Sequence, residues 1–405
     1  MRTYEETHPW LTFELNLAEA PPALWLLFGE ARSKCGHMAG VPLRPSVEDA
    51  LQQLFLAKGA LATTAIEGNT LSEEEVIRHL EGQLKLPPSR QYLTVEIDNI
   101  VTACNEIVQK VEAGESTALS PATIKEYNRQ VLVGLDLEKG VVPGRIRDHS
   151  VTVGNYRGAP AEDCEYLLGR LCDWLNSSDF KSGDRSELRL VLPIIAAIVA
   201  HLYLAWIHPF GDGNGRTARL IELQILFSSG VPMPAAHLLS NHYNQTRTEY
   251  YRQLARASQK GGGVISFLTY AVQGFVDGLR AQLDLVRSQQ WDVAWRDYVH
   301  EAFHDETGSV ARRRRNLILD LSDQAEGVPR AKVSQVSPRV AGAYATVTDM
   351  TLTRDLIELA KMGLLVKEPS GWRARRESIL AFLPRGGLAA LEAEQQALQQ
   401  ELALY

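Results

Sequence analysis

The segment from His208 to Arg219 gathers residue types that can act together on a phosphate. It reads His-Pro-Phe-Gly-Asp-Gly-Asn-Gly-Arg-Thr-Ala-Arg. Closely spaced glycines relieve the Cβ clash, so that successive backbone N–H groups can converge on one anion at the positive end of the following helix. We therefore expect Gly213, Asn214 and Gly215 to form a phosphate cradle.

The charged residues of the same segment complete a site for nucleophilic substitution at phosphorus. Asp212 offers the hard oxygen ligand that Mg²⁺ prefers, and Arg216 and Arg219 can neutralise phosphate charge. His208 can take a proton from an incoming hydroxyl, since an imidazole titrates near neutrality. A turn rich in Gly, Asp and Asn that ends in a helix cap is the ordinary alternative.

Two helices must position this loop. The apolar run from Leu190 to Ile207 approaches the length of a bilayer span. We interpret it as a buried helix and expect no membrane span, because it leads directly into the polar loop and the charges before it are of both signs. Helical periodicity resumes from Arg219 to Phe227.

The whole segment resembles the motif of the Fic family at every fixed position. The resemblance implies a protein adenylyltransferase, which moves AMP from ATP to a Ser, Thr or Tyr hydroxyl of a target protein and of itself. His208 would be the general base, Asp212 the Mg²⁺ ligand, and the cradle with Arg216 and Arg219 the phosphate site. Upstream, the segment from Pro143 to Gly154 is similar to the family's flap, in which Val151, Thr152 and Val153 would dock the target as an added strand.

A second motif is similar to the family's inhibitory sequence. Thr63 precedes Glu67 by four residues, and Gly68 follows. By resemblance, Glu67 would pair with Arg219 and block productive seating of the ATP γ-phosphate, so the chain would be autoinhibited by its own helix. A helix-terminal glutamate in a turn is the ordinary alternative for so short a motif.

Several functional points stay open. The segment around Tyr243 only loosely resembles the part of the family that contacts adenine, and aromatic residues on helices are more often core. A Fic enzyme that removes AMP is one alternative function. A DNA-binding regulator that uses the Fic domain as a sensor is another, and a homodimer is also open.

Composition limits the class of protein. The chain has 405 residues, 45% of them hydrophobic, with a formal net charge of -7. The length allows two or three globular domains, and the negative balance argues against generic binding of nucleic acid. Four cysteines without CxxC spacing predict neither a zinc knuckle nor a disulfide framework, and the N-terminus has no apolar signal region. We expect a cytoplasmic protein.

We predict a mainly α fold: a Fic helical bundle with a short β-hairpin flap, followed by a C-terminal winged-helix (α+β) domain. The winged helix is expected from the spacing of Thr353–Leu356 and Gly363–Leu365 before a wing near Gly371, with Arg354, Arg373, Arg375 and Arg376 as candidate DNA phosphate contacts or, equally, a protein-docking surface. The predicted divisions are an N-terminal helical region with the inhibitory helix (1–95), the catalytic core (96–260), a linker helix (261–295), the winged-helix domain (296–385) and a terminal helix (386–405).

A competing motif lies near the C-terminal domain. His300, Glu301 and His304 fit HExxH, which places two histidines one helical turn apart for Zn²⁺. Glu326 lies at a conceivable distance for a third ligand, but an amphipathic helix explains the spacing better.

Overall fold

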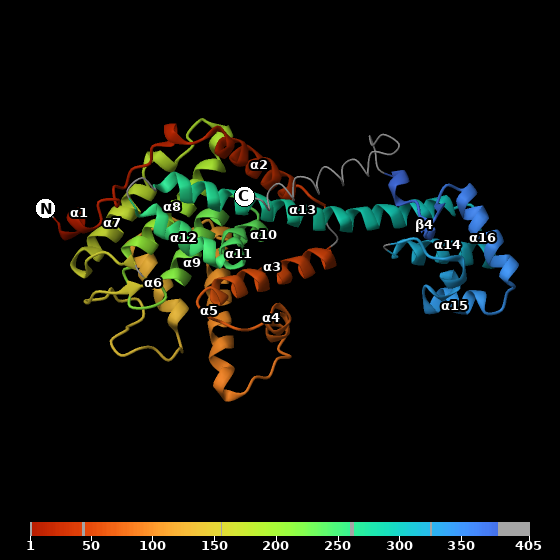
Figure 1. Cartoon of the computed structure of the whole chain (residues 1–405), viewed down its shortest axis with the longest axis horizontal. Coiled ribbons are helices and arrows are strands. Elements are labelled where there is room, and N and C mark those ends of the chain that lie inside the picture. The colour runs from red at the N-terminus through yellow and green to blue at the C-terminus, as the bar shows by residue number, and fades with distance from the viewer. Residues whose placement is uncertain (1, 43–44, 155, 260–262, 325, 380–405) are drawn as a thin grey trace. The chain divides into compact units, whose positions relative to one another are not determined.

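The computed structural model describes residues 2–42, 45–154, 156–259, 263–324 and 326–379. The chain divides into two compact units, Met1–Asp284 and Leu285–Tyr405 (Figure 1). The sequence predicted more divisions, because it suggested a boundary near residue 95. The predicted inhibitory helix shares one hydrophobic core with the helices of the predicted catalytic core, however, so both belong to the first unit. The predicted terminal helix, 386–405, lies outside the described residues.

The first unit is a bundle of helices, as the sequence predicted. Its helices are α1 (Thr3–Thr7), α2 (Pro22–Ala39), α3 (Pro45–Ala65), α4 (Glu73–Leu80), α5 (Gln91–Glu112), α6 (Pro121–Leu132), α7 (Cys164–Leu175), α8 (Val191–Ile207), α9 (Asn214–Ser228), α10 (Met233–Ala236), α11 (Leu238–Gln245) and α12 (Arg247–Ala257). Helix α13 (Val264–Ala302) begins in this unit and contains the boundary after Asp284.

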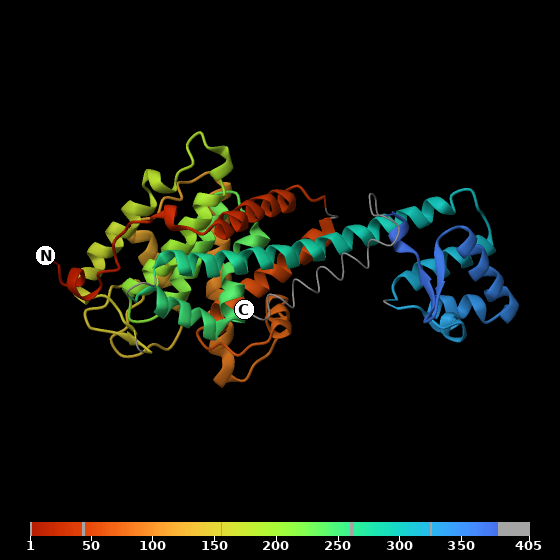
Figure 2. The same ribbon diagram turned by 45° about the horizontal axis from the view of Figure 1, so that its top comes forward.

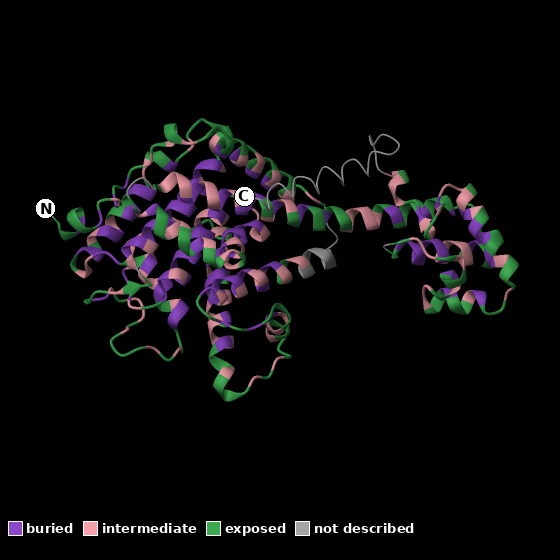
Figure 3. Ribbon diagram, in the orientation of Figure 1, coloured by how far each residue is buried: buried purple, intermediate pink, exposed green. Residues whose placement is uncertain are grey.

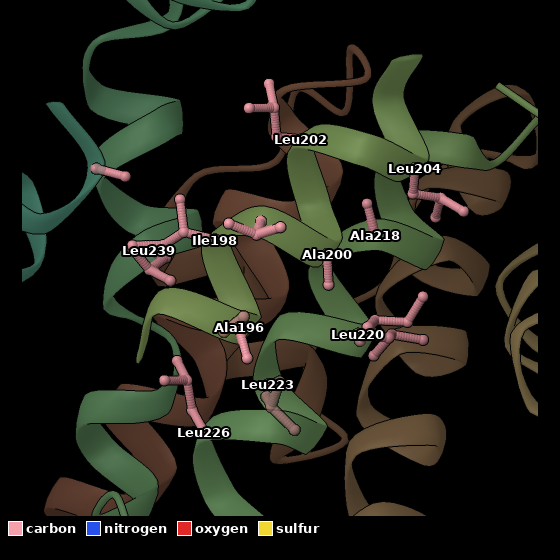
Figure 4. Packing of buried hydrophobic residues seen from close by; sticks show 14 of the residues in the cluster. Ala196, Ile198, Ala200, Leu202, Leu204, Ala218, Leu220, Leu223, Leu226 and Leu239 are labelled. Carbon is pink, nitrogen blue, oxygen red and sulfur yellow. The ribbon is translucent and has the colours of Figure 1, made fainter. Parts of the chain in front are cut away.

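Helices α8 and α9 form the centre of the first unit. Nearly every residue of α8 is buried, which Figure 3 shows as an almost continuous purple helix. Its alanines and branched side chains interleave with Ala218, Leu220 and Leu223 of α9 (Figure 4). Full burial of one Leu or Ile contributes about 1.5–3 kcal/mol, so this pair can hold the loop between them rigidly. The interpretation of the apolar run as a core helix is confirmed, and no described helix is both long and apolar enough to cross a bilayer.

Local sequence signals explain where the flanking helices begin. Ser72 accepts a hydrogen bond from the Glu75 backbone while the Glu75 carboxylate accepts one from the Ser72 backbone, which forms a capping box at the start of α4. At the start of α6, the Ser120 hydroxyl accepts a hydrogen bond from the Thr123 backbone (3.1 Å), and Pro121 lies in the first turn. Gly68 has a φ of 107°, and it allows the chain to leave α3 in a tight turn.

A two-stranded hairpin stands on this helical scaffold. Strand β1 (Thr152–Val153) pairs antiparallel with β2 (Tyr156–Arg157), with Thr152 opposite Arg157 and Val153 opposite Tyr156. Both residues of β1 are exposed. The structure thus contains the predicted hairpin between α6 and α7.

The second unit has its own hydrophobic core. It contains the C-terminal part of α13, the helices α14 (Ser309–Ser322), α15 (Pro338–Tyr344) and α16 (Asp349–Lys361), and the antiparallel strands β3 (Leu365–Glu368) and β4 (Gly371–Ala374). Figure 2 shows the hairpin beside these helices. An isolated bridge joins Val328 to Trp372 of β4. Helix α16 includes the predicted segment 353–356, and the predicted wing is the turn between β3 and β4.

Candidate active site

The candidate base, His208, lies where α8 ends. It adopts the left-handed conformation, with φ 51° and ψ 58°, which is uncommon for a residue with a side chain. Pro209 follows and cannot continue a helix. The chain therefore turns sharply as it leaves the core, and the imidazole lies at the edge of the core rather than inside it.

The imidazole of His208 is held in its neutral form. Burial lowers the pKa of His208 to about 4, and the nearby Arg147 cation acts in the same direction. A hydrogen bond to the Ala205 carbonyl and the carboxylates of Glu67 and Asp212 oppose this shift. A neutral imidazole is the form that can accept a proton from a hydroxyl.

Asn214 closes the loop that follows His208. Its side-chain carbonyl accepts a hydrogen bond from the Phe210 backbone N–H (3.0 Å), and its amide donates to the Phe210 carbonyl (2.9 Å). Asn128 of α6 donates to the carbonyl of Asp212 (2.8 Å). These bonds fix the loop so that the first turn of α9 faces the same space as His208.

The two glycines at the start of α9, Gly213 and Gly215, have no room for a side chain. A Cβ at Gly213 would lie 3.0 Å from Nδ2 of Asn128, and one at Gly215 would lie 2.2 Å from Oε1 of Glu67. The first N–H groups of a helix have no partner within it, and they attract anions. The carboxylate of Glu67 therefore lies where the predicted cradle would hold an anion.

Both arginines of the motif are buried and bound to carboxylates. The side chain of Arg219, 1% exposed, donates to Oε1 of Glu67 (2.6 Å) and to the Thr63 carbonyl (2.8 Å). Arg216, 5% exposed, donates to Glu96 of α5 (3.2 Å) and to Asp212 (3.3 Å). Within the described chain, Nε of both arginines and Nη1 of Arg219 are buried without a hydrogen-bond partner, so the pair has unused donors for further anionic oxygens.

The ion pair of Glu67 joins the end of α3 to α9. Desolvation pushes the pKa of the Glu67 carboxyl up, but the charge of Arg219 and its hydrogen bond outweigh that effect and leave this pKa below its usual value. Glu67 is therefore ionised at neutral pH. The side chain of Glu67 is 32% exposed, so solvent reaches one side of an otherwise buried pair.

Two further residues of this cluster were not predicted from the sequence. Asn69 donates to Oε2 of Glu96 (2.9 Å) and to the Leu93 carbonyl (2.9 Å), while its side-chain oxygen accepts from the Leu71 backbone (3.0 Å). Asn69 thus ties the turn that carries Glu67 to the partner of Arg216. Glu96 lies on an amphipathic helix whose sequence carries no sign of a site. Asn69, one residue after Gly68, could have been noticed as part of the turn.

Asp212 can accept a metal ion that arrives with a nucleotide. Its carboxylate is 49% exposed and bonded to Arg216. Mg²⁺ usually takes one or two carboxylates together with phosphate oxygens and water. No group of three metal-ligating side chains occurs within the described residues. Asp212 therefore suits a Mg²⁺ ion that is also bound by a nucleotide, rather than one bound by protein ligands alone.

Tyr243 is a correction to the prediction. The structure places it in the core, fully buried, with its hydroxyl donating to the buried carboxylate of Glu222 (2.9 Å). It packs against Tyr250 and His201. Its full burial leaves no surface for adenine to contact in this conformation. The expected contact came only from a loose resemblance, and the ordinary alternative, a core aromatic, describes this residue.

The HExxH spacing does not produce a helical pair of histidines. Helix α13 ends at Ala302, so His300 lies in its last turn and His304 in the turn beyond it. Both side chains are exposed. The geometry that the zinc motif needs, two histidines on one helical face, is therefore not formed.

Comparison with known proteins agrees with this geometry. Residues 118–226, which include α6, the hairpin, α8 and most of α9, match the sequence model of the Fic/DOC family. Residues 118–226 therefore form a Fic/DOC domain. The match contains His208, Asp212 and both motif arginines but not the segment with Glu67.

Curated Fic relatives resemble a larger part of the chain. A protein adenylyltransferase of Caenorhabditis elegans is 32% identical over 229 residues, which is 55% of this chain and 41% of that protein. One from Nematostella vectensis is 28% identical over 214 residues, covering 52% of this chain and 45% of its own length. The matched region is thus less than half the length of these relatives.

Solved structures share the fold. A Fic family protein from Desulfovibrio desulfuricans superimposes with a TM-score of 0.52 at 20% identity, covering 87% of this chain and 96% of that chain. A fragment of the Caenorhabditis elegans protein gives a TM-score of 0.50 at 24% identity, covering 66% of this chain and 74% of its own. At these identities the likeness concerns the fold alone.

Proposed function

We propose that this Fic protein transfers AMP from ATP to a Ser, Thr or Tyr hydroxyl of a target protein and of itself. The observation that carries the proposal is a neutral imidazole beside a helix N-terminus that has two buried arginines with unused donors. Relatives named protein adenylyltransferase support the reaction class. The cradle and the arginines would bind the phosphates, which leaves the α-phosphorus facing His208.

The reaction is a displacement at phosphorus. The hydroxyl oxygen of the target forms a bond to the α-phosphorus as His208 takes its proton. The bond from that phosphorus to the bridging oxygen breaks, and pyrophosphate leaves with the electron pair. Arg216 and Arg219 stabilise the charge that develops on the phosphates. Mg²⁺ held by Asp212 would supply further neutralisation of phosphate charge.

We also propose that Glu67 keeps the enzyme inhibited. Its carboxylate occupies a donor of Arg219 and lies against Gly215, in the space that phosphate oxygens would need. A carboxylate there repels the nucleotide's charge and satisfies the arginine. Removal of AMP from a modified protein is the alternative function, and release of AMP by the form with Glu67 intact would favour it.

The hairpin suggests how a target docks. The backbone N–H of Gly158 donates to the Val151 carbonyl (3.1 Å), so these two residues form a hydrogen-bonded pair. The next pair, Thr152 and Arg157, is then a non-hydrogen-bonded pair, whose backbone N–H and C=O groups point away from the partner strand. The Arg157 carbonyl accepts a hydrogen bond from Nε2 of His8 (2.9 Å), whereas Thr152 is exposed. We propose that the target's extended segment pairs with the Thr152 edge.

The second unit is proposed to be a winged helix, on the order of its helices and its hairpin. Of the four candidate DNA contacts, Arg373 is bound by Glu368 and Glu377, and Arg376 by Asp292. This leaves the DNA-binding alternative to Arg354 and Arg375, which are exposed. A salt-dependent complex with DNA in the absence of labelling would favour the regulator over the enzyme.

Labelling of the full chain with ATP and Mg²⁺ tests the proposed function. We expect Glu67→Gly to raise incorporation of labelled AMP roughly tenfold or more, because a partly buried charged pair is worth about 1–3 kcal/mol and 1.4 kcal/mol is a tenfold change. Adding His208→Ala should abolish the signal. Glu81→Gly, an exposed carboxylate at the end of α4, is the matched control and should leave it unchanged. Equal labelling by the Glu67 variant and the unaltered protein would exclude autoinhibition.

A further inference from the structure

Arg147 is a buried cation bound by backbone carbonyls. Arg147 is only 5% exposed, and its side chain donates hydrogen bonds to the backbone carbonyls of four residues. They are His208 (2.7 Å), His149 (2.5 Å), Ala159 and Ile207 (3.5 Å). These partners are carbonyl oxygens rather than carboxylates, so they leave the cation's charge in place. A buried arginine without a carboxylate among its bonded partners is unusual, because desolvation of the charge is costly.

The carbonyls at the end of α8 show why an arginine is needed there. The last carbonyls of a helix have no partner within it. Here the Leu204 carbonyl accepts from the His208 backbone (2.9 Å), that of Trp206 from the Tyr156 hydroxyl (2.8 Å), and that of Ile207 from the Ala159 backbone (3.2 Å). Arg147 binds the next carbonyl, that of His208 itself. It also places a positive charge at the negative end of the helix dipole.

The same guanidinium holds both ends of the flap. His149 lies before β1 and Ala159 after β2, and both carbonyls accept from Arg147. The backbone N–H of Arg147 donates to the Pro209 carbonyl (3.0 Å), next to the bridge between Ile146 and Phe210. A Cβ at Gly158 would lie 2.9 Å from the Cβ of His208, so the flap base and the imidazole are in close contact.

We propose that Arg147 is a positioning residue: one rigid, charged fork locks His208 in its left-handed conformation and sets the flap at a fixed place beside it. The same cation also opposes protonation of the imidazole. The proposal rests on the proposed function. It assigns to Arg147 a part in both halves of the reaction, the base and the docking of the target. Only arginine offers five donors in a planar fork of this kind.

The charged groups that face His208 come from three segments. Burial is the largest cause of its lowered pKa, and the Arg147 cation lowers that pKa further. Glu67, after α3, and Asp212, in the loop, raise it. In the Glu67→Gly form one opposing carboxylate is gone, so Arg147 should then have the larger relative influence.

A purely structural arginine and a positioning arginine predict different results. Loss of a structural cap would destabilise the first unit as a whole and leave the titration of His208 unchanged. Loss of a positioning charge would shift that titration even where the protein remains folded. Arg147→Lys and Arg147→Gln separate the two contributions, because lysine keeps the charge without the fork and glutamine keeps some hydrogen bonding without the charge.

The experiment follows the imidazole of His208 by NMR across pH in the full-length Glu67→Gly protein, with its signal assigned by its loss in His208→Ala. We expect Arg147→Gln to raise the titration midpoint by roughly one pH unit or more, and Arg147→Lys to shift it by clearly less. Arg145→Gln, which removes an exposed cation two residues away, should leave the midpoint unchanged. This readout needs no turnover, so it tests the charge even if AMP transfer itself fails.

Hydrogen exchange and labelling complete the test. Both Arg147 variants should exchange the amides of 149–154 and 156–159 faster than the Arg145 control, and self-labelling at pH 7 should fall roughly tenfold or more, since small misplacements of reacting groups are costly. If the Arg147→Gln variant is too unstable for a titration, hydrogen exchange of the flap amides and AMP labelling of the Arg147→Lys variant test the proposal instead. An unshifted midpoint in a folded Gln variant, or exchange that rises uniformly over the first unit, would overturn the proposal.

Discussion

At the scale of single residues, the site is defined by which charges meet which partners. Arg216 and Arg219 are each bound by a carboxylate, and His208 lies between a nearby cation and two nearby carboxylates. Residue types and spacing in one motif were sufficient to predict His208, Asp212 and the two arginines as a cluster. Glu96 and Arg147 could not be predicted, because they come from distant segments and only tertiary packing brings them to the loop.

The lowered pKa of His208 predicts the pH profile of AMP transfer. The base must be neutral, so activity is present above its pKa and is lost as the pH falls through it. We expect the acidic limb of kcat/KM for the Glu67→Gly variant to lie well below the 6.5 of an ordinary histidine, towards the value of about 4. Initial labelling rates across pH measure it. Samples returned to pH 7 after acid exposure control for unfolding, and a reversible limb centred at 6.5 would contradict the prediction.

At the scale of elements, the turn after α3 is what presents Glu67 to α9. The chain leaves α3 through Gly68, which has a positive φ, and a capping box at Ser72 and Glu75 begins α4. The contact with α5 was not predictable, since the donors of Asn69 find the Leu93 carbonyl and the Glu96 carboxylate only after the helices pack. Tyr243 shows a different limit, because its expected contact with adenine came from a loose resemblance and only the packing shows that its side chain lies in the core.

Substitution of Asn69 should loosen the inhibitory turn. Asn69→Asp keeps the oxygen that accepts from Leu71 but replaces both donated bonds with repulsion against Glu96 and the Leu93 carbonyl. We expect AMP labelling to rise severalfold, though less than with Glu67→Gly, because the carboxylate itself remains. Asn99→Asp is the matched control: it breaks a similar bond from α5, to the Val133 carbonyl (2.8 Å), away from the turn. No rise above that control would argue against a role of Asn69 in inhibition.

At the scale of the whole molecule, two separate cores predict two separable stabilities. The first unit contains histidines whose pKa values are lowered by desolvation: His8, His208, His237 and His242, the last three to about 4. In the second unit, His300 and His304 are exposed. The helical class, the hairpin and the order of the C-terminal elements were predictable from periodicity and turn residues. The predicted linker helix, 261–295, includes the division after Asp284, but its exact place was not predictable because one continuous helix contains it.

Acid should therefore weaken the first unit before the second. A histidine with a lowered folded-state pKa stabilises the fold fully above its unfolded value of 6.5, and this contribution is lost as the pH falls from 6.5 towards 4. A shift of this size corresponds to roughly 3 kcal/mol for each such residue at most. Between pH 7 and pH 5, the midpoint of urea unfolding should move to a lower urea concentration for the first unit and should move less for the second unit. His237→Gln should reduce the movement of the first transition, and two transitions that shift equally would contradict the assignment.

The proposed competition between Glu67 and ATP for the guanidinium of Arg219 has a thermodynamic consequence. The carboxylate of Glu67 is part of the same chain, so its effective concentration at Arg219 is set by the fold and does not change on dilution. Free nucleotide, in contrast, competes by mass action. The fraction of protein with ATP bound productively would therefore depend on the ATP concentration relative to the fixed effective concentration of Glu67. The rate of AMP transfer would then rise with the concentration of ATP even with no other regulator bound.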